Sequence, residues 1–358
     1  MPNNYTKEKN AEYTVKLRNM LELLPAFASD FFRGITDTTQ IRTRLAYSYD
    51  LRIFFYYLKN VNDKFQDRND EKDFTVTDLD LIKAIDIEKY SEFLSYYQLP
   101  NYKDPSKMMT YTNSANGKMR KLATLRSFYK YYFKRELIQT NPAELVDLPK
   151  IHEKPIIRLE VNEVADLLDG VEDGNRLSET AKRFHEKTAL RDTALIALML
   201  GTGIRISECI GLNISDFDFS NNSFIVTRKG GDKAILYLSQ EVADILTNYL
   251  QEYRNKIEGI KPGDEDAMFL SLQKKRMGVS AVEKMVKKYT RSIVPLKNIS
   301  PHKFRSTFGT NLYLETGDIY LVADVLGHKD VNTTRKHYAD VEEDRRKQAA
   351  KVIKLRKD

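Results

Sequence analysis

Residues 193–208 read TALIALMLGTGIRISE, and this stretch joins an apolar helix to a glycine-rich turn. The first half of the stretch predicts a helix with apolar residues on most sides. The two glycines then predict a tight turn, after which Arg205 opens a new helix. A guanidinium group at a helix start can meet an anion beside free backbone N–H groups. Taken alone, this stretch favours the interpretation of Arg205 as an ordinary surface arginine over that of an anion-binding residue.

Short strands are predicted on the carboxyl side of this turn. Apolar residues alternate over 217–219, 224–227 and 235–238, with an Asn-Asn and a Gly-Gly pair as the turns between them. The second turn belongs to the segment TRKGG, which places Lys229 at a hairpin tip. A lysine there reaches outward and can donate a proton. A basic tip that serves solubility alone is the alternative interpretation.

Two further segments carry histidine, arginine and tyrosine. SPHKFR at 300–305 predicts a helix with Ser at the N-cap and Pro at its first position. His302 and Arg305 share a helix face, where an imidazole can handle a proton and a guanidinium can neutralise a phosphate. LGHKD at 326–330 is followed, ten residues after His328, by Tyr338. A chance His-x-x-Arg match and a buried structural tyrosine are the alternatives.

The first part of the chain is predicted to be all helical. Apolar residues recur at helical spacing over 16–58, 87–97 and 118–137, whereas 101–116 is polar and predicts a loop. We expect no strand before residue 150.

A linker is predicted near the middle of the chain. Residues 149–158 read PKIHEKPIIR, with two prolines and little apolar periodicity. The expected organisation is a helical domain at 1–150, a linker at 151–158 and a second domain at 159–358.

The helix at 118–137 is unusually basic. Between Lys118 and Arg135 lie seven basic residues and no acidic one. A helix of this kind can dock its apolar stripe on a core and present its cations to phosphates. A solvated charged face is the alternative, although ordinary exposed helices mix both signs. The predicted stripe is Leu122, Leu125, Tyr129, Tyr132 and Phe133. The DNA-binding candidates are Lys118, Arg120, Lys121, Arg126, Lys130 and Lys134.

Composition favours a globular protein with a polyanionic partner. Of 358 residues, 41% are hydrophobic and 30% charged, and the net charge is +7. The chain has no run of about 18 apolar residues, and its start lacks a secretory signal, so we expect no membrane insertion. Cys209 is the one cysteine, which fits a cytoplasmic location.

Read in order, these segments resemble the signature of the tyrosine recombinases, the phage integrase family. The resemblance covers the whole second domain. It implies a mainly α fold, with a helical N-terminal core-binding domain and a mixed α/β catalytic domain, mostly helical with a small antiparallel sheet. TRKGG at 227–231 and SAVEKMV at 280–286 further resemble the single-chain Xer recombinases of streptococci and lactococci, known as XerS. The residues that match the signature are Arg205, Lys229, His302, Arg305, His328 and Tyr338.

The resemblance implies a site-specific recombinase that cleaves and rejoins DNA through a 3′-phosphotyrosyl intermediate. Tyr338 is then the nucleophile and His302 the proton acceptor. A phosphodiester bond is exchanged for a phosphotyrosine bond and later restored without net loss of bond energy, so no ATP is needed. The sequence contains no Gly-x-x-x-x-Gly-Lys-Ser/Thr loop and no cluster that demands a metal, so we expect no cofactor.

The remaining signature residues receive roles by the same resemblance. Arg205 and Arg305 neutralise charge on the phosphate, Lys229 protonates the departing 5′ oxygen, and His328 donates a further hydrogen bond. Glu208, three residues after Arg205, is expected to orient that guanidinium group. An ordinary ion pair between neighbouring turns explains its position equally well.

Recombination cuts four strands, so the expected assembly is a homo-tetramer, two dimers on a double-stranded recombination site. The tail at 342–358 is expected to dock on a neighbouring protomer, with a frayed end as the alternative. Chromosome dimer resolution, with a DNA translocase of the division machinery as a further partner, is one expected role. The integrase or excisionase of a mobile element is the other. The rivals outside the family are a type IB topoisomerase-like enzyme and a non-catalytic DNA-binding protein.

Overall fold

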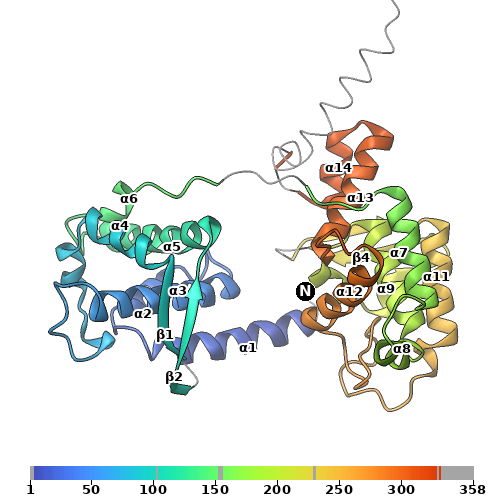
Figure 1. Cartoon of the computed structure of the whole chain (residues 1–358), viewed down its shortest axis with the longest axis horizontal. Coiled ribbons are helices and arrows are strands. Elements are labelled where there is room, and N and C mark those ends of the chain that lie inside the picture. Colours follow the sequence, from blue (N-terminus) through green and yellow to red (C-terminus); the bar gives the residue numbers. More distant parts are fainter. Residues whose placement is uncertain (1–3, 102–103, 152–155, 229–230, 329, 332–358) are drawn as a thin grey trace, which may run out of the picture. The chain divides into compact units, whose positions relative to one another are not determined.

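The computed structural model describes residues 4–101, 104–151, 156–228, 231–328 and 330–331. The chain divides into two compact units, residues 4–153 and residues 154–358 (Figure 1). Each unit has its own hydrophobic core.

The first unit is built mainly from helices around an aromatic core. Phe128 lies at its centre, and its ring centroid is 5.2 Å from that of Phe31 and 6.1 Å from that of Phe55. All three side chains are completely buried, so edge-to-face ring contacts hold their helices together. The helices are α1 (Asn4–Leu21), α2 (Ala28–Gly34), α3 (Ile41–Asn60), η1 (Glu71–Asp73), η2 (Val76–Leu81), α4 (Ala84–Phe93), α5 (Ala115–Phe133) and α6 (Pro142–Leu145).

A β-hairpin also belongs to the first unit. Strand β1 (Tyr96–Asn101) pairs antiparallel with β2 (Asp104–Thr112). The prediction that this part of the chain is all helical, with a loop over 101–116, is therefore wrong. Tyr97 and Leu99 of β1 are buried, whereas most side chains of β2 are exposed. A strand that covers little core has no reason to alternate apolar and polar residues, so its sequence signal is weak.

Helix α5 is the predicted basic helix, displaced by a few residues. Leu125, Tyr129 and Tyr132 of the predicted apolar stripe are buried. Phe133 is 46% exposed, however, and Phe128 is in the core instead. Phe128 lies four residues before Tyr132 and shares its face of the helix, whereas Phe133 is the last residue of α5.

The second unit packs helices around α9. The elements of this unit are α7 (Val161–Asp173), α8 (Glu179–His185), α9 (Ala189–Thr202), α10 (Ile206–Cys209), η3 (Ile214–Asp216), β3 (Phe217–Asp218), β4 (Ser223–Thr227), β5 (Lys233–Tyr237), α11 (Gln240–Glu252), η4 (Arg254–Lys256), α12 (Val279–Ile293), α13 (Pro301–Thr316) and α14 (Ile319–Leu326). Helix α9 is buried from Arg191 to Leu200 and contacts α7, α11 and α13. Because it is covered on several sides, apolar residues occur on most of its sides. The three strands form an antiparallel sheet in the order β3-β4-β5, at the predicted positions. The mainly helical fold class is confirmed.

Candidate active site

The glycine turn after α9 places Arg205 at the start of α10. Gly203 ends α9 with φ 61°, and a Cβ atom there would lie 2.5 Å from Cδ1 of Phe308, so glycine is required on both counts. Arg205 occupies the N-cap of α10, and its Nη1 lies 2.8 Å from Oε1 of Glu208. The Glu208 side chain is 4% exposed and that of Arg205 is 31% exposed. The predicted contact between these two side chains is present, and it leaves the arginine partly open to solvent.

Helix α13 carries Arg305 to the same turn. Ser300 is at the N-cap of this helix and Pro301 at its first position, as predicted. Arg305 is 4% exposed and donates to the carbonyl oxygen of Gly203 at 2.8 Å and to that of Leu326. His302, one turn earlier on the same helix, is exposed. Two of the predicted site residues, Arg205 and Arg305, therefore lie on either side of one glycine turn.

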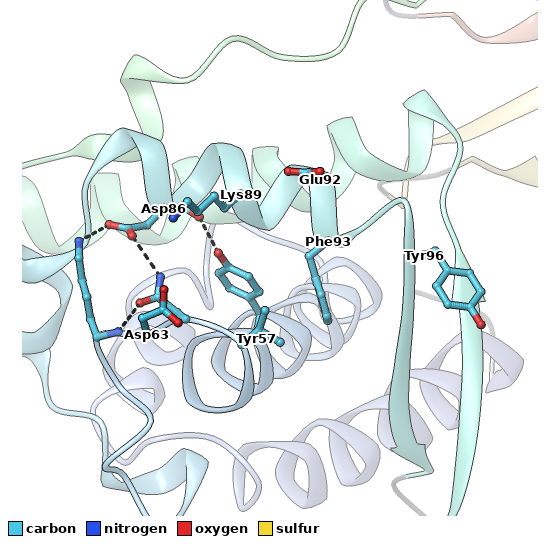
Figure 2. Close-up of a pocket in the computed structure, with 10 residues that line it drawn as sticks. Tyr57, Asp63, Asp86, Lys89, Glu92, Phe93 and Tyr96 are labelled. Carbon is cyan, nitrogen blue, oxygen red and sulfur yellow. Dashed lines mark hydrogen bonds and ion pairs between the residues drawn. The ribbon is translucent and has the colours of Figure 1, made fainter.

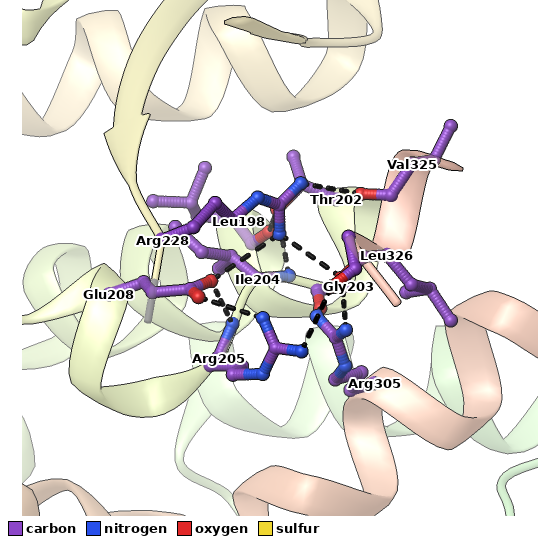
Figure 3. A network of polar contacts seen from close by, with 11 residues as sticks. Leu198, Thr202, Gly203, Ile204, Arg205, Glu208, Arg228, Arg305, Val325 and Leu326 are labelled. Atoms are coloured by element: carbon purple, nitrogen blue, oxygen red, sulfur yellow. Dashed lines mark hydrogen bonds and ion pairs between the residues drawn. The ribbon is translucent and has the colours of Figure 1, made fainter. Parts of the chain in front are cut away.

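The C-terminal end of α14 draws three guanidinium groups together (Figure 3). Its last carbonyl groups have no partner within the helix and carry partial negative charge. The Gly327 oxygen accepts from Arg205 at 3.4 Å, and the Leu326 oxygen accepts from both Arg305 and Arg228. Residues far apart in the sequence thus meet at one helix end, directly before His328.

Arg228 was not singled out by the sequence. It follows β4, and its Nη2 donates to the Val325 oxygen at 2.7 Å while its Nη1 lies 3.5 Å from Oε2 of Glu208. Burial lowers the pKa of the Arg228 guanidinium below its ordinary value, although Glu208 opposes this. The signal in the sequence was the pair of adjacent basic residues in TRKGG, of which the family signature selects only Lys229.

The remaining predicted catalytic residues are His328, Lys229 and Tyr338. His328 is half-buried, and its backbone N–H donates to the Ala323 oxygen at 2.9 Å. Lys229 and Tyr338 lie outside the described residues. Cys209 is fully buried in α10, and burial raises the pKa of its thiol, in keeping with a role in the core.

Several cations of α5 are engaged within the first unit. Arg120 binds the buried carboxylate of Asp50, with Nη2 2.6 Å from Oδ1. Burial raises the pKa of Asp50 even though Arg120 opposes this. Arg126 donates to two backbone oxygens, at 3.1 Å and 2.6 Å. These contacts give Arg120 and Arg126 structural partners.

The remaining lysines of α5 divide in the same way. Lys121 is 6% exposed and donates to Asn113 at 2.8 Å, and burial lowers its pKa. Lys118 donates to Ser95 at 2.6 Å. Lys130 and Lys134 are exposed. Of the predicted DNA-binding residues, these two are the most available to an external phosphate.

A pocket of about 500 Å³ lies in the first unit, beside α3 and α4 (Figure 2). The Asp86 carboxylate in its wall accepts from Lys64 at 2.5 Å and from Asn62 at 3.1 Å. Tyr57 donates its hydroxyl to the Asp86 backbone oxygen at 3.2 Å. These contacts satisfy Asp86 and Tyr57 within the protein, so we assign these two residues a structural role.

Two further kinds of feature are absent from the part of the chain that the structure describes. There, no three or more His, Cys, Asp or Glu side chains are grouped so as to hold a metal ion. Nor does any helix in that part combine the length and apolar character needed to span a bilayer.

Comparison with known proteins identifies the family. The model of the phage integrase family matches residues 158–345. Tyrosine recombinase XerC of Caldanaerobacter subterraneus is 34% identical over 295 residues, 81% of this chain and 75% of that protein. Tyrosine recombinase XerD of Lacticaseibacillus casei is 30% identical over 216 residues, 60% of this chain and 69% of that protein.

Solved structures share the fold. XerH site-specific recombinase bound to palindromic difH substrate superposes with a TM-score of 0.60 and 19% identity, over 83% of this chain and 75% of that chain. The Tn1549 transposon integrase in complex with circular intermediate DNA gives a TM-score of 0.61 and 19% identity, over 86% of this chain and 93% of that chain. The family model covers more than half of the chain and the Xer relatives agree with it, so the chain belongs to the phage integrase family and is a tyrosine recombinase.

Proposed function

We propose that this chain cuts and rejoins DNA at a specific site, with Tyr338 bonded to the 3′ phosphate in the intermediate. The observation that carries the proposal is the meeting of Arg205, Arg228 and Arg305 at the C-terminal end of α14. Arg205 and Arg228 share the Glu208 carboxylate, and Arg305 is held by the backbone oxygens of Gly203 and Leu326. A phosphodiester anion is the ligand that such a group of cations favours.

The chemistry assigned to Tyr338 requires help with a proton. A free phenol has a pKa of about 10, so roughly one part in a thousand is ionised at neutral pH, a deficit of about 4 kcal/mol. In the proposed step His302 accepts the phenol proton as the phenolic oxygen attacks phosphorus. The bond from phosphorus to the 5′ oxygen breaks, and Lys229 gives that oxygen a proton. The 5′ hydroxyl of a partner strand reverses the step.

Arg205 and Arg305 act on the phosphate in this proposal. Charge builds on the non-bridging oxygens as the phosphorus becomes five-coordinate, and fixed cations stabilise it without rearranging. The carbonyl oxygens of Gly203, Leu326 and Gly327 hold the two guanidinium groups before DNA arrives. Glu208 orients Arg205, and His328 adds a hydrogen bond to the phosphate.

Replacing Tyr338 by Phe tests the nucleophile. The Tyr338→Phe variant is expected to form no covalent protein–DNA adduct, because the attacking oxygen is gone, while its affinity for DNA stays within about twofold. Adducts are counted on denaturing gels after incubation with sheared, end-labelled host DNA. Tyr320→Phe is the matched control, since Tyr320 is 71% exposed on α14 and should retain adduct formation. Undiminished adducts in Tyr338→Phe contradict the assignment.

We also propose that Lys130 and Lys134 contact the DNA backbone. Lys130 is exposed on α5 and Lys134 is exposed at its C-cap. Arg120, Lys121 and Arg126 bind groups within the protein, although the Arg120 side chain is 50% exposed. Each phosphate contact releases counterions, so loss of two contacts should lower the slope of log affinity against log salt by about 1.8.

The double variant Lys130→Gln/Lys134→Gln measures this slope on a short duplex of random sequence. The control is Lys256→Gln/Lys261→Gln, which removes two exposed lysines of the second unit. An equal change of slope in both double variants would show that the loss of net charge, rather than contact through α5, is responsible.

The biological role we propose is chromosome dimer resolution, supported by the XerC and XerD names of the sequence relatives. Sequencing the host DNA bound to trapped adducts tests it. One cleaved locus near the replication terminus is expected. Cleavage at the ends of a mobile element would support the integrase role instead.

A homo-tetramer on two duplexes is part of the same proposal, because four strands must be exchanged. The tail at 342–358, proposed to join protomers, lies outside the described residues. We place the reaction on cytoplasmic DNA, with a DNA translocase as a further partner. Light scattering of complexes on the mapped site should give four protomers for two duplexes, whereas a monomer that relaxes one duplex would favour a topoisomerase.

A further inference from the structure

Arg228 connects the β4–β5 hairpin to the C-terminal end of α14. It directly follows β4, and its backbone N–H donates to the Asp232 oxygen at 2.7 Å, which closes the tip. Its side chain is 10% exposed and turns into the protein, where it donates to the oxygens of Val325 at 2.7 Å and Leu326 at 3.2 Å (Figure 3). The hairpin is thereby bound to the end of α14, 97 residues away in sequence.

Gly327 makes room for this contact. A Cβ atom on Gly327 would lie 3.0 Å from both Cζ and Nε of Arg228, tighter than ordinary packing allows. Gly327 also has φ 63°, which a residue with a side chain adopts at a cost. The guanidinium group therefore packs against the backbone of the helix end, with Glu208 at 3.5 Å from its Nη1.

The contact between Arg228 and α14 bears on the proposed reaction because of the residue that follows Arg228 in the chain. The next residue is Lys229, which the proposed function makes the proton donor to the 5′ oxygen. Neighbouring Cα atoms are about 3.8 Å apart, so a contact that holds Arg228 also limits how far the next residue can move. Proton transfer in a transition state requires the donor to be within hydrogen-bond reach of the leaving oxygen.

We propose that Arg228 is a positioning residue: it binds the β4–β5 hairpin to the C-terminal end of α14 so that Lys229 meets the departing 5′ oxygen. The inference rests on the proposed function, and in particular on Lys229 as the acid. Arg228 itself touches protein carbonyl oxygens and a carboxylate, so its effect on the reaction passes through the lysine.

Arg276 provides a matched structural arginine in the same unit. Its side chain is 7% exposed and donates to the backbone oxygens of Ile210 at 3.1 Å and Leu212 at 2.7 Å. Like Arg228, it fastens a loop through a guanidinium group. Its guanidinium group binds the segment after α10 and the Asp264 carboxylate.

The test compares Arg228→Gln with Arg276→Gln on two DNA substrates. Both substrates are nicked duplexes of the mapped site, and one has sulfur in place of the bridging 5′ oxygen at the cleaved phosphate. A thiolate leaves without protonation because a thiol, with a pKa of about 8.5, is far more acidic than an alcohol. Arg228→Gln should cleave the oxygen substrate at least about tenfold more slowly than the parent protein and the sulfur substrate within about threefold of it.

Arg276→Gln should cleave both substrates at close to the parent rate once unfolded protein is discounted by thermal melting. The double variant Arg228→Gln/Lys229→Ala should be no slower on the oxygen substrate than Lys229→Ala, because both changes remove the same proton transfer. If Arg228→Gln does not fold, Arg228→Lys replaces it, since one ammonium cannot reproduce the two-carbonyl contact.

Equal loss on the oxygen and sulfur substrates, or no loss on either, overturns the proposal. Additive losses in the double variant overturn it as well. Failure of the proposed function is seen separately, because the parent protein would then form no Tyr338 adduct on either substrate.

Discussion

Two buried carboxylates in the second unit, Asp192 and Glu208, are surrounded in different ways. The Asp192 side chain is 1% exposed and accepts from Arg191 at 2.6 Å, Tyr289 at 2.9 Å and Thr188 at 2.9 Å. The Arg191 side chain is itself only 7% exposed. Glu208 is as well covered, but its partner Arg205 is 31% exposed.

The difference separates an ion pair that serves the fold from one that can serve a ligand. Around Asp192 the buried Arg191 and the hydroxyl groups of Thr188 and Tyr289 satisfy the carboxylate inside the core, and burial raises the pKa of Tyr289 well above its ordinary value. A second cation, Lys288, is 26% exposed and lies farther off, at 3.4 Å. Around Glu208 two arginines share one carboxylate, and one of them retains access to solvent. A phosphate can therefore join the second cluster without first breaking up the core.

Removing the charge of Asp192 should give the largest effect on stability. Asp192→Asn leaves the Arg191 guanidinium buried without its counter-ion, which costs about 3–5 kcal/mol in the free energy of unfolding. Urea denaturation measures this loss. Asp244→Asn is the control, since Asp244 is exposed on α11 and should change stability by less than about 0.5 kcal/mol.

Cleavage of the mapped site by the folded fraction of Asp192→Asn should stay near the parent rate. A selective loss of cleavage, with stability unchanged, would mean that the Asp192 cluster is not purely structural.

Glu208→Gln should slow cleavage more than it lowers stability, which is the reverse of Asp192→Asn, and its effect in kcal/mol should be the smaller of the two. The amide no longer holds Arg205 by charge, so single-turnover cleavage should slow about tenfold, or about 1.4 kcal/mol in the barrier. Stability should fall by less than in Asp192→Asn, because Arg205 keeps access to water and the more buried Arg228 keeps its carbonyl partners at Val325 and Leu326. Equal loss of stability in the two variants, with cleavage intact, would remove the distinction between the clusters.

Much of the second unit could be predicted because its signals are local. The glycine turn before Arg205 and the start of α13, with Ser300 at the N-cap, each depend on a few adjacent residues. The contact between Arg205 and Glu208 follows from their spacing within one turn.

The first unit was harder to predict, because the burial of some of its side chains does not follow the apolar periodicity of the sequence. The exposed strand β2 carries no alternation, so a loop was expected over 101–116. Basic residues of α5 were expected to face DNA together, yet Arg120 meets Asp50, 70 residues earlier in the chain. No pattern within a helix reveals such a partner.

The sequence by itself determined the reactive residue types, their order and the family, because motif spacing and helix signals are properties of neighbouring residues. Only the tertiary structure decided that Arg205, Arg228 and Arg305 meet at the end of α14. The unfilled carbonyl groups of a helix end attract whichever cations the fold brings to them, and that depends on packing between segments about a hundred residues apart.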